Sequence, residues 1–390
     1  MEQPHPPHEQ PINIPPELQI LRDRLDDIDH AFLELLAERH KAVSQVAAIK
    51  RTSGVPIRDS HREASLLDDR RHRAQANGLD PDVIESLFRL VLWASRNRQA
   101  NLLAAVPQDL QPCRIAVIGA AGGMGKLLVD LFSSFGHEVL QVDRDTKLTI
   151  ADAAADADVT VLAVNIEQTE AVAKLAGPHV RPDGLLTDVT STKRRPVQAM
   201  LSATEASVIG THPLFGPAVH SLQGQRLAIT PGRLTEGTQW MEWLCQMYRG
   251  AGMILLETTP EDHDRVMAVV QVLTHYSTEV LGRTMQKLGV SIDETMTFTS
   301  PIYHLELLMT ARHFAQSPDL YGAIEMSNPN TPQVVEAFRA AAEEFETLLL
   351  ANDQEAFNET FQEVSDFFGP FANTALREST HLIDRMVERS

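Results

Sequence analysis

The stretch that most constrains the fold is RIAVIGAAGGMGKLLVDLF, which begins at Arg114. A short apolar run ends in glycine, and a glycine-rich turn then opens an amphipathic helix. Nucleotide-binding α/β folds begin in this way, because glycine lets the backbone approach a phosphate and the helix N-terminus supplies N–H groups. Two further strand-like runs, HEVLQVD and ADVTVLAVN, follow. The alternation of strands and helices predicts a Rossmann-type, parallel α/β sheet.

The glycine turn departs from the usual G-x-G-x-x-G pattern, because Ala120 occupies the first position and a glycine stands one residue earlier. An acid that ends the next strand accepts hydrogen bonds from ribose hydroxyls and repels a 2′-phosphate, so NAD is favoured as cofactor. Arg144 beside that acid leaves NADP open, and a turn that only packs a helix on a strand is the structural alternative. The predicted cofactor-binding residues are Gly119, Gly122, Gly123, Met124, Gly125 and Asp143.

Three helices are predicted before this sheet. From Leu18 to Ile49 apolar residues recur every three or four positions without a proline, which predicts one long amphipathic helix. A second helix is expected to begin near Asp59, and a third to run from about Val83 to Ala104. A helix of about 32 residues spans ~48 Å and extends beyond two shorter neighbours. Three such helices make a poor core for one chain, so pairing with a second copy is expected.

Beyond Asp262 the strand signals end and long amphipathic helical stretches return, such as TPQVVEAFRAAAEEFETLLL. The chain is therefore expected to be multidomain, with two all-α parts around one α/β part. The predicted divisions are a disordered Pro-rich tail (1–16), an all-α domain (17–106), a Rossmann-type domain (112–258) and a helical domain for substrate binding and dimerisation (259–390).

Composition excludes several partners. Asp and Glu number 53 against 34 Lys and Arg, so the formal charge of −19 disfavours nucleic acid and anionic membranes as partners. Cys113 and Cys245 are too few for a disulfide framework or a cysteine metal site, which is typical of the reducing cytoplasm. The first residues, MEQPHPPHEQ, lack the basic and apolar regions of a signal peptide. A cytoplasmic protein without a metal site is expected.

The cations of the first predicted helix include Arg22, Arg39 and Lys50. At 100° per residue Arg39 and Lys50 lie within about 20° of each other, whereas Arg22 points about 100° away. One chain therefore cannot readily bring all three into one pocket, and surface charge is the ordinary role for a single arginine. The start of the second helix adds three more charged residues, Asp59, Arg62 and Glu63.

Residues 18–102 resemble the helical chorismate mutase family. The resemblance rests on LRDRLDDID, LLAERHKAV, the position of Lys50, VPIRDSHRE and a late Gln99, all in that family's order. It implies an intertwined dimer whose site clamps a dicarboxylate and stabilises charge on the ether oxygen of a pericyclic reaction, without a nucleophile. By this resemblance Arg22 from the partner, Arg39 and Arg62 hold carboxylates, Lys50 and Gln99 face the ether oxygen, and Asp59 and Glu63 hold the hydroxyl.

Two further motifs, DVTSTK and THPLFGP, follow strand-like runs, where open α/β sheets place ligands. With EDHDRVMAVVQVLTH and SPIYHLELLMTARHFAQ, they make residues 112–385 resemble prephenate dehydrogenase. The implied reaction is oxidative decarboxylation of prephenate to 4-hydroxyphenylpyruvate. His212 is the expected acceptor of the substrate's hydroxyl proton, since neutral imidazole suits a general base near pH 7. Ser191 is expected to bind the same hydroxyl and to orient the imidazole.

The same resemblance places a carboxylate-binding cation at Arg312, because a guanidinium grips a carboxylate bidentately. His304 stands where related enzymes carry arginine, which puts a second cationic contact in doubt. His263 and His275 also match family positions, and packing or capping roles are equally open for them. His275 is included among the expected substrate-binding residues.

Together the two halves resemble the bifunctional chorismate mutase/prephenate dehydrogenase family of bacterial tyrosine biosynthesis. Chorismate and prephenate are then the expected substrates, the chain is expected to form a homodimer, and inhibition by tyrosine is left open. Arogenate in place of prephenate also stays open, because the two differ by an amino group against a keto oxygen. The sequence further leaves open a dehydrogenase of another hydroxy acid with a helical interaction module, and a catalytically silent NAD sensor.

Overall fold

The computed structural model describes residues 15–53, 59–103, 111–219 and 221–387. The described residues fall into two compact units, one holding the N-terminal helices and the other most of the remaining chain. The predicted tail lies almost wholly in residues 1–14, outside the described residues. The first helix begins at Pro16, a residue type favoured in the first turn because its missing N–H would have no intrahelical partner.

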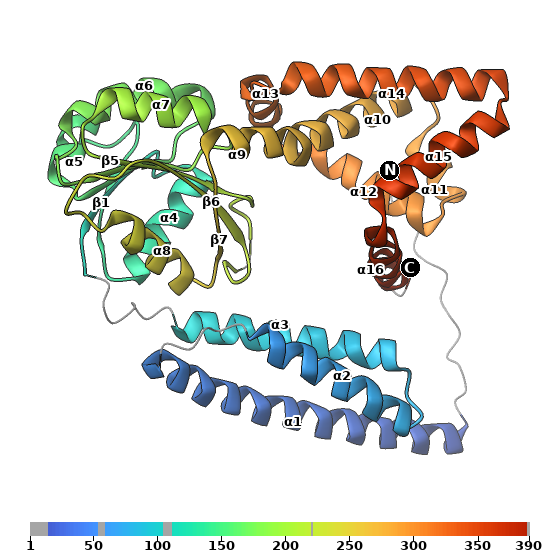
Figure 1. The fold of residues 1–390 in the computed structure, drawn as a ribbon. Helices are drawn as coiled ribbons and strands as arrows, with labels where there is room; N and C mark the ends of the chain where they lie inside the picture. Colours follow the sequence, from blue (N-terminus) through green and yellow to red (C-terminus); the bar gives the residue numbers. More distant parts are fainter. Residues whose placement is uncertain (1–14, 54–58, 104–110, 220, 388–390) are drawn as a thin grey trace, which may run out of the picture. The chain divides into compact units, whose positions relative to one another are not determined.

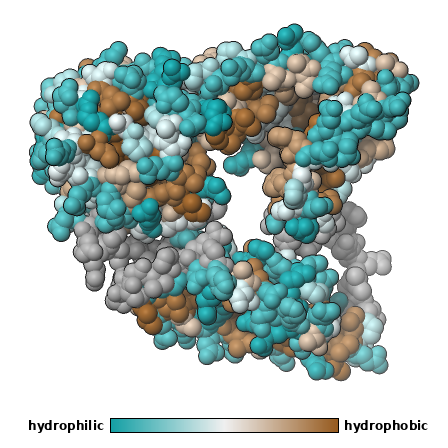
Figure 2. Space-filling view, viewed as in Figure 1, coloured by the Kyte–Doolittle hydropathy of each residue, from teal (hydrophilic) through white to brown (hydrophobic). Residues whose placement is uncertain are grey.

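The first unit is built from three helices, α1 (Pro16–Ser53), α2 (Ser60–Ala76) and α3 (Pro81–Leu103), so the three predicted helices are confirmed (Figure 1). Few apolar side chains are buried among the described residues here, and these are Val43, Ala47, Leu67 and Ala74. Much of the apolar face of α1 is exposed, as the brown surface on these helices in Figure 2 shows. Its exposed members are Leu18, Ile20, Leu21, Leu25, Ile28, Phe32, Leu33, Leu35, Val46 and Ile49.

The second unit contains a seven-stranded sheet in the order β2-β1-β3-β4-β5-β6-β7. The predicted Rossmann-type sheet is confirmed, and one strand departs from the parallel arrangement: β6 runs antiparallel to β5, while β6 and β7 are parallel. The strands are β1 (Arg114–Ile118), β2 (Glu138–Val142), β3 (Val159–Leu162), β4 (Leu185–Asp188), β5 (Ser207–Pro213), β6 (Arg226–Arg233) and β7 (Ile254–Glu257).

Helices cover both faces of this sheet (Figure 1). One face carries α4 (Gly123–Ser134) and α8 (Trp240–Gly250); the other carries α5 (Ile150–Asp156), α6 (Ile166–Ala176), the short η1 (Gly177–His179) and α7 (Arg194–Ala203). The strand order reverses at β1, which lies between β2 and β3. Open α/β sheets bind ligands at the carboxyl ends of strands beside such a reversal.

A helical part follows the sheet. Its first helical run passes from α9 (Pro260–Met267) through a π-helical segment, η2 (Ala268–Leu273), into α10 (Thr274–Leu288). The remaining helices are α11 (Ile292–Thr297), α12 (Pro301–Phe314), α13 (Pro318–Ser327), α14 (Thr331–Ala351), α15 (Gln354–Phe368) and α16 (Pro370–Val387). None of the helices in the described ranges has the length and hydrophobicity needed to cross a membrane.

Candidate active sites

The glycine turn at the end of β1 is closely packed. Gly119 has φ of 92°, in the left-handed region that favours glycine, and its N–H donates to the Val142 carbonyl at 2.8 Å. A Cβ built on Gly125 would lie 2.1 Å from the Gly119 carbonyl oxygen, so only glycine fits there. Gly122 is the N-cap of α4 and offers no side chain to the first turn. The turn and the helix N-terminus together can therefore cradle a phosphate group.

Asp143, at the end of β2, lies against this turn. Its Oδ2 accepts a hydrogen bond from the Ala121 N–H at 2.9 Å, and its Oδ1 accepts one from the Arg144 N–H at 2.8 Å. These two bonds, the one from Ala121 first, lower the pKa of Asp143. Each carboxylate oxygen keeps a lone pair that can accept a hydrogen bond from a ribose hydroxyl.

A buried chain of three side chains ends at the predicted base. His212 lies near the end of β5 with 2% of its surface exposed. Its Nδ1 lies 2.9 Å from Nε2 of His263, and Nδ1 of His263 lies 2.8 Å from Oδ1 of Asp264. Both partners belong to the first turns of α9, where Thr259 is the N-cap. The orienting contact on His212 thus comes from His263, whereas the sequence predicts it from Ser191.

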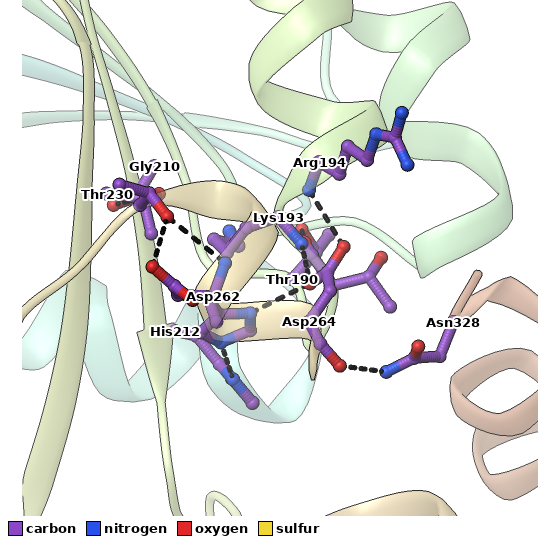
Figure 3. A network of polar contacts seen from close by, with 12 residues as sticks. Thr190, Lys193, Arg194, Gly210, His212, Thr230, Asp262, Asp264 and Asn328 are labelled. Atoms are coloured by element: carbon purple, nitrogen blue, oxygen red, sulfur yellow. Dashed lines mark hydrogen bonds and ion pairs between the residues drawn. The ribbon is translucent and has the colours of Figure 1, made fainter. Parts of the chain in front are cut away.

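Asp264 fixes the direction of the protons along this chain. Its carboxylate also accepts the backbone N–H groups of Lys193 and Arg194 at 2.8 and 3.0 Å, as Figure 3 shows at the start of α7. A carboxylate requires the His263 Nδ1 to carry a proton, so the neutral His263 accepts at Nε2 and His212 donates from Nδ1. The His212 Nε2, which makes no hydrogen bond within the described residues, is then left with a free lone pair.

The environment also keeps His212 neutral. Burial first, then the positive charge that His263 carries whenever it is protonated, and then the charge of Lys193, hold the pKa of His212 well below its usual value. Lys193 is fully buried and forms an ion pair with Asp188, whose side chain is also fully buried. Its Nζ donates to the Thr211 carbonyl at 2.6 Å, one residue before His212. Through these two contacts Lys193 ties the end of β4 to β5, one residue before His212.

The other predicted dehydrogenase residues belong to a loop of the sheet domain and to α12. Ser191 is partly buried in the loop after β4, and no hydrogen bond joins it to His212 in the described part of the chain. Arg312 is exposed on α12 and close enough to Tyr321 to influence the pKa of that phenol. His304 lies two turns earlier on α12 and makes no side-chain contact that the described residues show.

Asn328, just after α13, connects the helical part to the histidine chain. Its side-chain amide donates to the backbone carbonyl of Asp264 at 2.9 Å, a contact drawn in Figure 3. Sequence reasoning gave no role to Asn328, Asp264 or Lys193 and left His263 undecided. The motif EDHD at a helix start was the available signal, since a buried His-Asp pair needs partners of the kind found here.

In the first unit, two of the predicted mutase residues, Arg39 and Glu63, contact α3. Arg39 donates from Nη1 to the Ser95 hydroxyl, and Glu63 forms an ion pair with Arg96 at 2.8 Å. Burial lowers the pKa of Lys50, and Asp59 and Glu63 oppose this shift while Arg62 adds to it, so all three charges lie near the Lys50 ammonium group. Sequence reasoning missed Ser95 and Arg96, because neither lies in a predicted motif.

The remaining predicted mutase residues differ in burial and in hydrogen bonding. Gln99 is 8% exposed, and its Oε1 is buried without a hydrogen-bond partner in the described part of the chain. Asp59 is the N-cap of α2 and accepts from the Arg62 N–H at 2.9 Å, a structural contact that the resemblance does not imply. Arg22 is exposed on α1, on a different side of the helix from Arg39 and Lys50.

Three family models match the chain. The model described as chorismate mutase type II matches residues 21–100, and the prephenate dehydrogenase nucleotide-binding domain matches residues 136–274. The prephenate dehydrogenase dimerization domain matches residues 259–363. The three matches cover the N-terminal helices, most of the sheet and much of the helical part.

Full-length relatives are also similar to this chain. A T-protein of Enterobacter agglomerans is 35% identical over 369 residues, covering 94% of this chain and 97% of that protein. A T-protein of Haemophilus influenzae is 31% identical with the same coverage. A crystal structure of prephenate dehydrogenase from A. aeolicus, in complex with hydroxyphenyl propionate and NAD+, has a TM-score of 0.54 and 20% identity. It covers 66% of this chain and 98% of that one, and shows a shared fold.

Proposed function

The chain belongs to the T-protein family of bifunctional chorismate mutase/prephenate dehydrogenases in tyrosine biosynthesis, and we propose that its helical N-terminal part and the rest of the chain carry one activity each. The chain rearranges chorismate to prephenate and oxidises prephenate to 4-hydroxyphenylpyruvate with NAD. We assign the mutase to residues 17–106, the nucleotide-binding domain to 112–258 and the helical substrate domain to 259–390.

The mutase needs positioning and charge, because a pericyclic rearrangement forms no covalent bond to the enzyme. We assign the substrate carboxylates to Arg39, Arg62 and the partner's Arg22, since Arg22 points away from the other cations of its own helix. Lys50 and Gln99 face the ether oxygen, where negative charge develops in the transition state. Asp59 and Glu63 bind the hydroxyl, and the contacts from Ser95 and Arg96 hold Arg39 and Glu63 in place.

In the dehydrogenase, His212 accepts the substrate's hydroxyl proton at Nε2. The proposal rests on one observation, the hydrogen-bonded chain His212–His263–Asp264, because it leaves a lone pair on the buried, neutral imidazole. The imidazolium that forms is stabilised through His263 by the Asp264 carboxylate. Ser191 contributes a hydroxyl to the same substrate group, and Arg312 binds a substrate carboxylate, with His304 and His275 nearby on the substrate side.

The glycine turn fits a dinucleotide, because a Cβ at Gly125 would fill the space beside the Gly119 carbonyl and the first turn of α4 has no side-chain cap. NAD, when bound, accepts the hydride that leaves the ring carbon of prephenate. The pyrophosphate is assigned to the turn and the adenosine ribose hydroxyls to Asp143, so the full set is Gly119, Gly122, Gly123, Met124, Gly125 and Asp143.

The assignment is tested with purified protein, chorismate and NAD. We expect absorbance at 340 nm to rise as NADH forms, with 4-hydroxyphenylpyruvate as the product, and prephenate alone to give the same rise without a lag. A protein that consumes chorismate but shows no absorbance rise with prephenate would exclude the dehydrogenase assignment. Failure to consume chorismate, with prephenate oxidised normally, would exclude the mutase assignment alone.

Asp264→Asn is expected to lower kcat for prephenate oxidation about 100-fold, with KM for prephenate changed less than about threefold. The variant keeps one oxygen but loses the charge that stabilises the imidazolium, and its amide NH₂ would face the backbone N–H of Arg194 or Lys193. Steady-state kinetics at saturating NAD measure both parameters. Asp262→Asn is the matched control, because Asp262 lies in the same turn but is exposed and pairs with Arg265. A loss confined to KM, or an equal loss in the control, would contradict the role of Asp264.

A homodimer and a cytoplasmic location complete the proposal. The exposed apolar face of α1 and the match to a dimerization domain support pairing of two copies. Exposed apolar residues of the helical part, Leu288, Phe298, Ile302, Met326, Phe361, Phe367 and Phe371, support it as well. Cys113 and Cys245 form no disulfide within the described residues, and a chain with so few cysteines suits a reducing compartment. Chorismate and prephenate are the small-molecule partners, and nucleic acid and membranes are not expected as partners.

A further inference from the structure

An ion pair links α2 to α3 within the proposed mutase site. The Arg96 guanidinium of α3 donates from Nη1 to Oε1 of Glu63 at 2.8 Å, and the two side chains are 22% and 18% exposed. By contrast, Arg73 and Asp69 of α2 pair at 70% and 44% exposure. Because a shielded pair is screened less by water and salt, the charge of Arg96 acts strongly on Glu63.

Arg96 approaches the site from the same side as Gln99. The two residues are three positions apart on α3, so their side chains lie on one face of the helix. Gln99 is assigned to the ether oxygen, and Glu63 also influences the pKa of Lys50, the second group assigned to that oxygen. Arg96 therefore adds a cation where the hydroxyl and the ether oxygen of the substrate are assigned.

The charge of Glu63 alone would oppose binding of a dianionic substrate. An unpaired carboxylate in the pocket repels the two carboxylates of chorismate, and it attracts the Lys50 ammonium group away from the ether oxygen. Arg96 offsets this negative charge. A carboxylate has about four lone-pair positions, so Glu63 can accept hydrogen bonds from both the guanidinium and a substrate hydroxyl. The ion pair thus keeps an acceptor at this position without its full charge.

The same ion pair affects which ring substituent the site accepts. A hydroxyl is neutral and needs only an acceptor, whereas an ammonium group gains most from a carboxylate whose charge is not offset. A guanidinium next to that carboxylate also repels a second cation. Glu63 paired with Arg96 therefore favours a hydroxyl over an ammonium group on the ring.

We propose that Arg96 is a specificity-determining residue of the mutase, which holds Glu63 as the acceptor of a ring hydroxyl and disfavours substrates with an ammonium group in its place. The inference rests on the proposed function, because Glu63 is assigned there to the substrate's hydroxyl. Arg96 acts through Glu63 and through its own charge, and is a positioning residue that adds no chemical step to the rearrangement.

The test compares chorismate with 4-amino-4-deoxychorismate, the analogue in which a protonated amino group replaces the ring hydroxyl. Loss of substrate absorbance gives kcat and KM for each compound, and the wild-type protein should prefer chorismate. Arg96→Gln should shift the ratio of the two kcat/KM values about 10- to 100-fold towards the amino analogue, the range typical of hydrogen bonds to charged groups. Arg96→Lys keeps the positive charge and should retain the preference for chorismate.

Three further measurements separate this effect from a loss of structure. Arg98→Gln removes an exposed arginine of the same helix and should leave the ratio within about twofold of the wild-type value. Glu63→Gln should shift the ratio in the opposite direction to Arg96→Gln, because its amide oxygen still accepts from a hydroxyl but no longer attracts an ammonium group. Prephenate oxidation should be equal in all of these proteins, since the substituted residues lie in the other compact unit.

The outcomes distinguish the inference from the function on which it rests. If Arg96→Gln lowers both kcat/KM values equally, or if the wild-type protein uses both compounds equally well, the inference is wrong and the mutase assignment stands. If the wild-type protein does not rearrange chorismate, the assignment and the inference both fail. Arg96→Met retains the aliphatic part of the side chain and should give the same shift, and it replaces Arg96→Gln if thermal melting shows that the latter does not fold.

Discussion

His212→Asn is expected to lower kcat for prephenate oxidation by about 1000-fold, within the range found for loss of a general base. Asparagine is too weak a base to accept the hydroxyl proton, although it is close to histidine in size. Because the His212 side chain is buried between β5 and α9, the substitution also removes the group that His263 and Asp264 stabilise. Chorismate consumption by the same protein should be unchanged, since none of the mutase residues lies in this unit.

A pH profile and a control variant test the role of His212 further. In the wild-type protein, kcat/KM for prephenate should not change as the pH falls from 8 to 6.5. Burial keeps the pKa of His212 well below 6.5, so the imidazole stays neutral over this range. His179→Asn, at an exposed histidine of the same α/β part, should retain activity within about twofold, as surface substitutions usually do. A His212→Asn protein that still oxidises prephenate at half the wild-type rate would show that another group accepts the proton.

The elements predicted correctly from the sequence were those that short stretches of sequence specify. The glycine turn, the parallel strands around it and the three N-terminal helices each depend on residues close together in the chain. The direction of β6 was missed although the segment between Pro213 and Arg226 contains no helical pattern, and a parallel crossover usually needs one. The π-helical segment Ala268–Leu273 was also missed, because one wider turn hardly alters an apolar pattern with a period near 3.6 residues.

The site was predicted less completely, for a physical reason. His212 stood out because a turn motif surrounds it, but its partner His263 lies 51 residues away and no periodicity links the two. The EDHD motif was open to capping or function, and the structure contains both kinds of contact. Thr259 caps α9 by accepting from the Asp262 N–H at 3.1 Å, while Asp264 turns inward and holds His263. Burial decides between the two roles, and burial is a property of the folded chain.

Lys50→Ala is expected to lower kcat for chorismate rearrangement by about 1000-fold, the upper range for losing one group that stabilises developing negative charge. Lys50 is partly buried near Asp59 and Glu63, so its ammonium group lies close to the start of α2. Removing it leaves two carboxylates beside the ether oxygen, which would oppose the charge that develops there. Loss of chorismate absorbance measures this rate, and supplied prephenate should still be oxidised at the wild-type rate.

Lys41→Ala is the matched control, because Lys41 is exposed on the same helix and the substitution removes the same charge from the unit. It should retain mutase activity within about twofold, since exposed charges act weakly across water and salt. If Lys50→Ala abolished both reactions without unfolding the protein, the two activities would not occupy separate sites. If Lys41→Ala and Lys50→Ala lost equal mutase activity, net charge and not the position of Lys50 would explain the rate, because position alone distinguishes the two lysines.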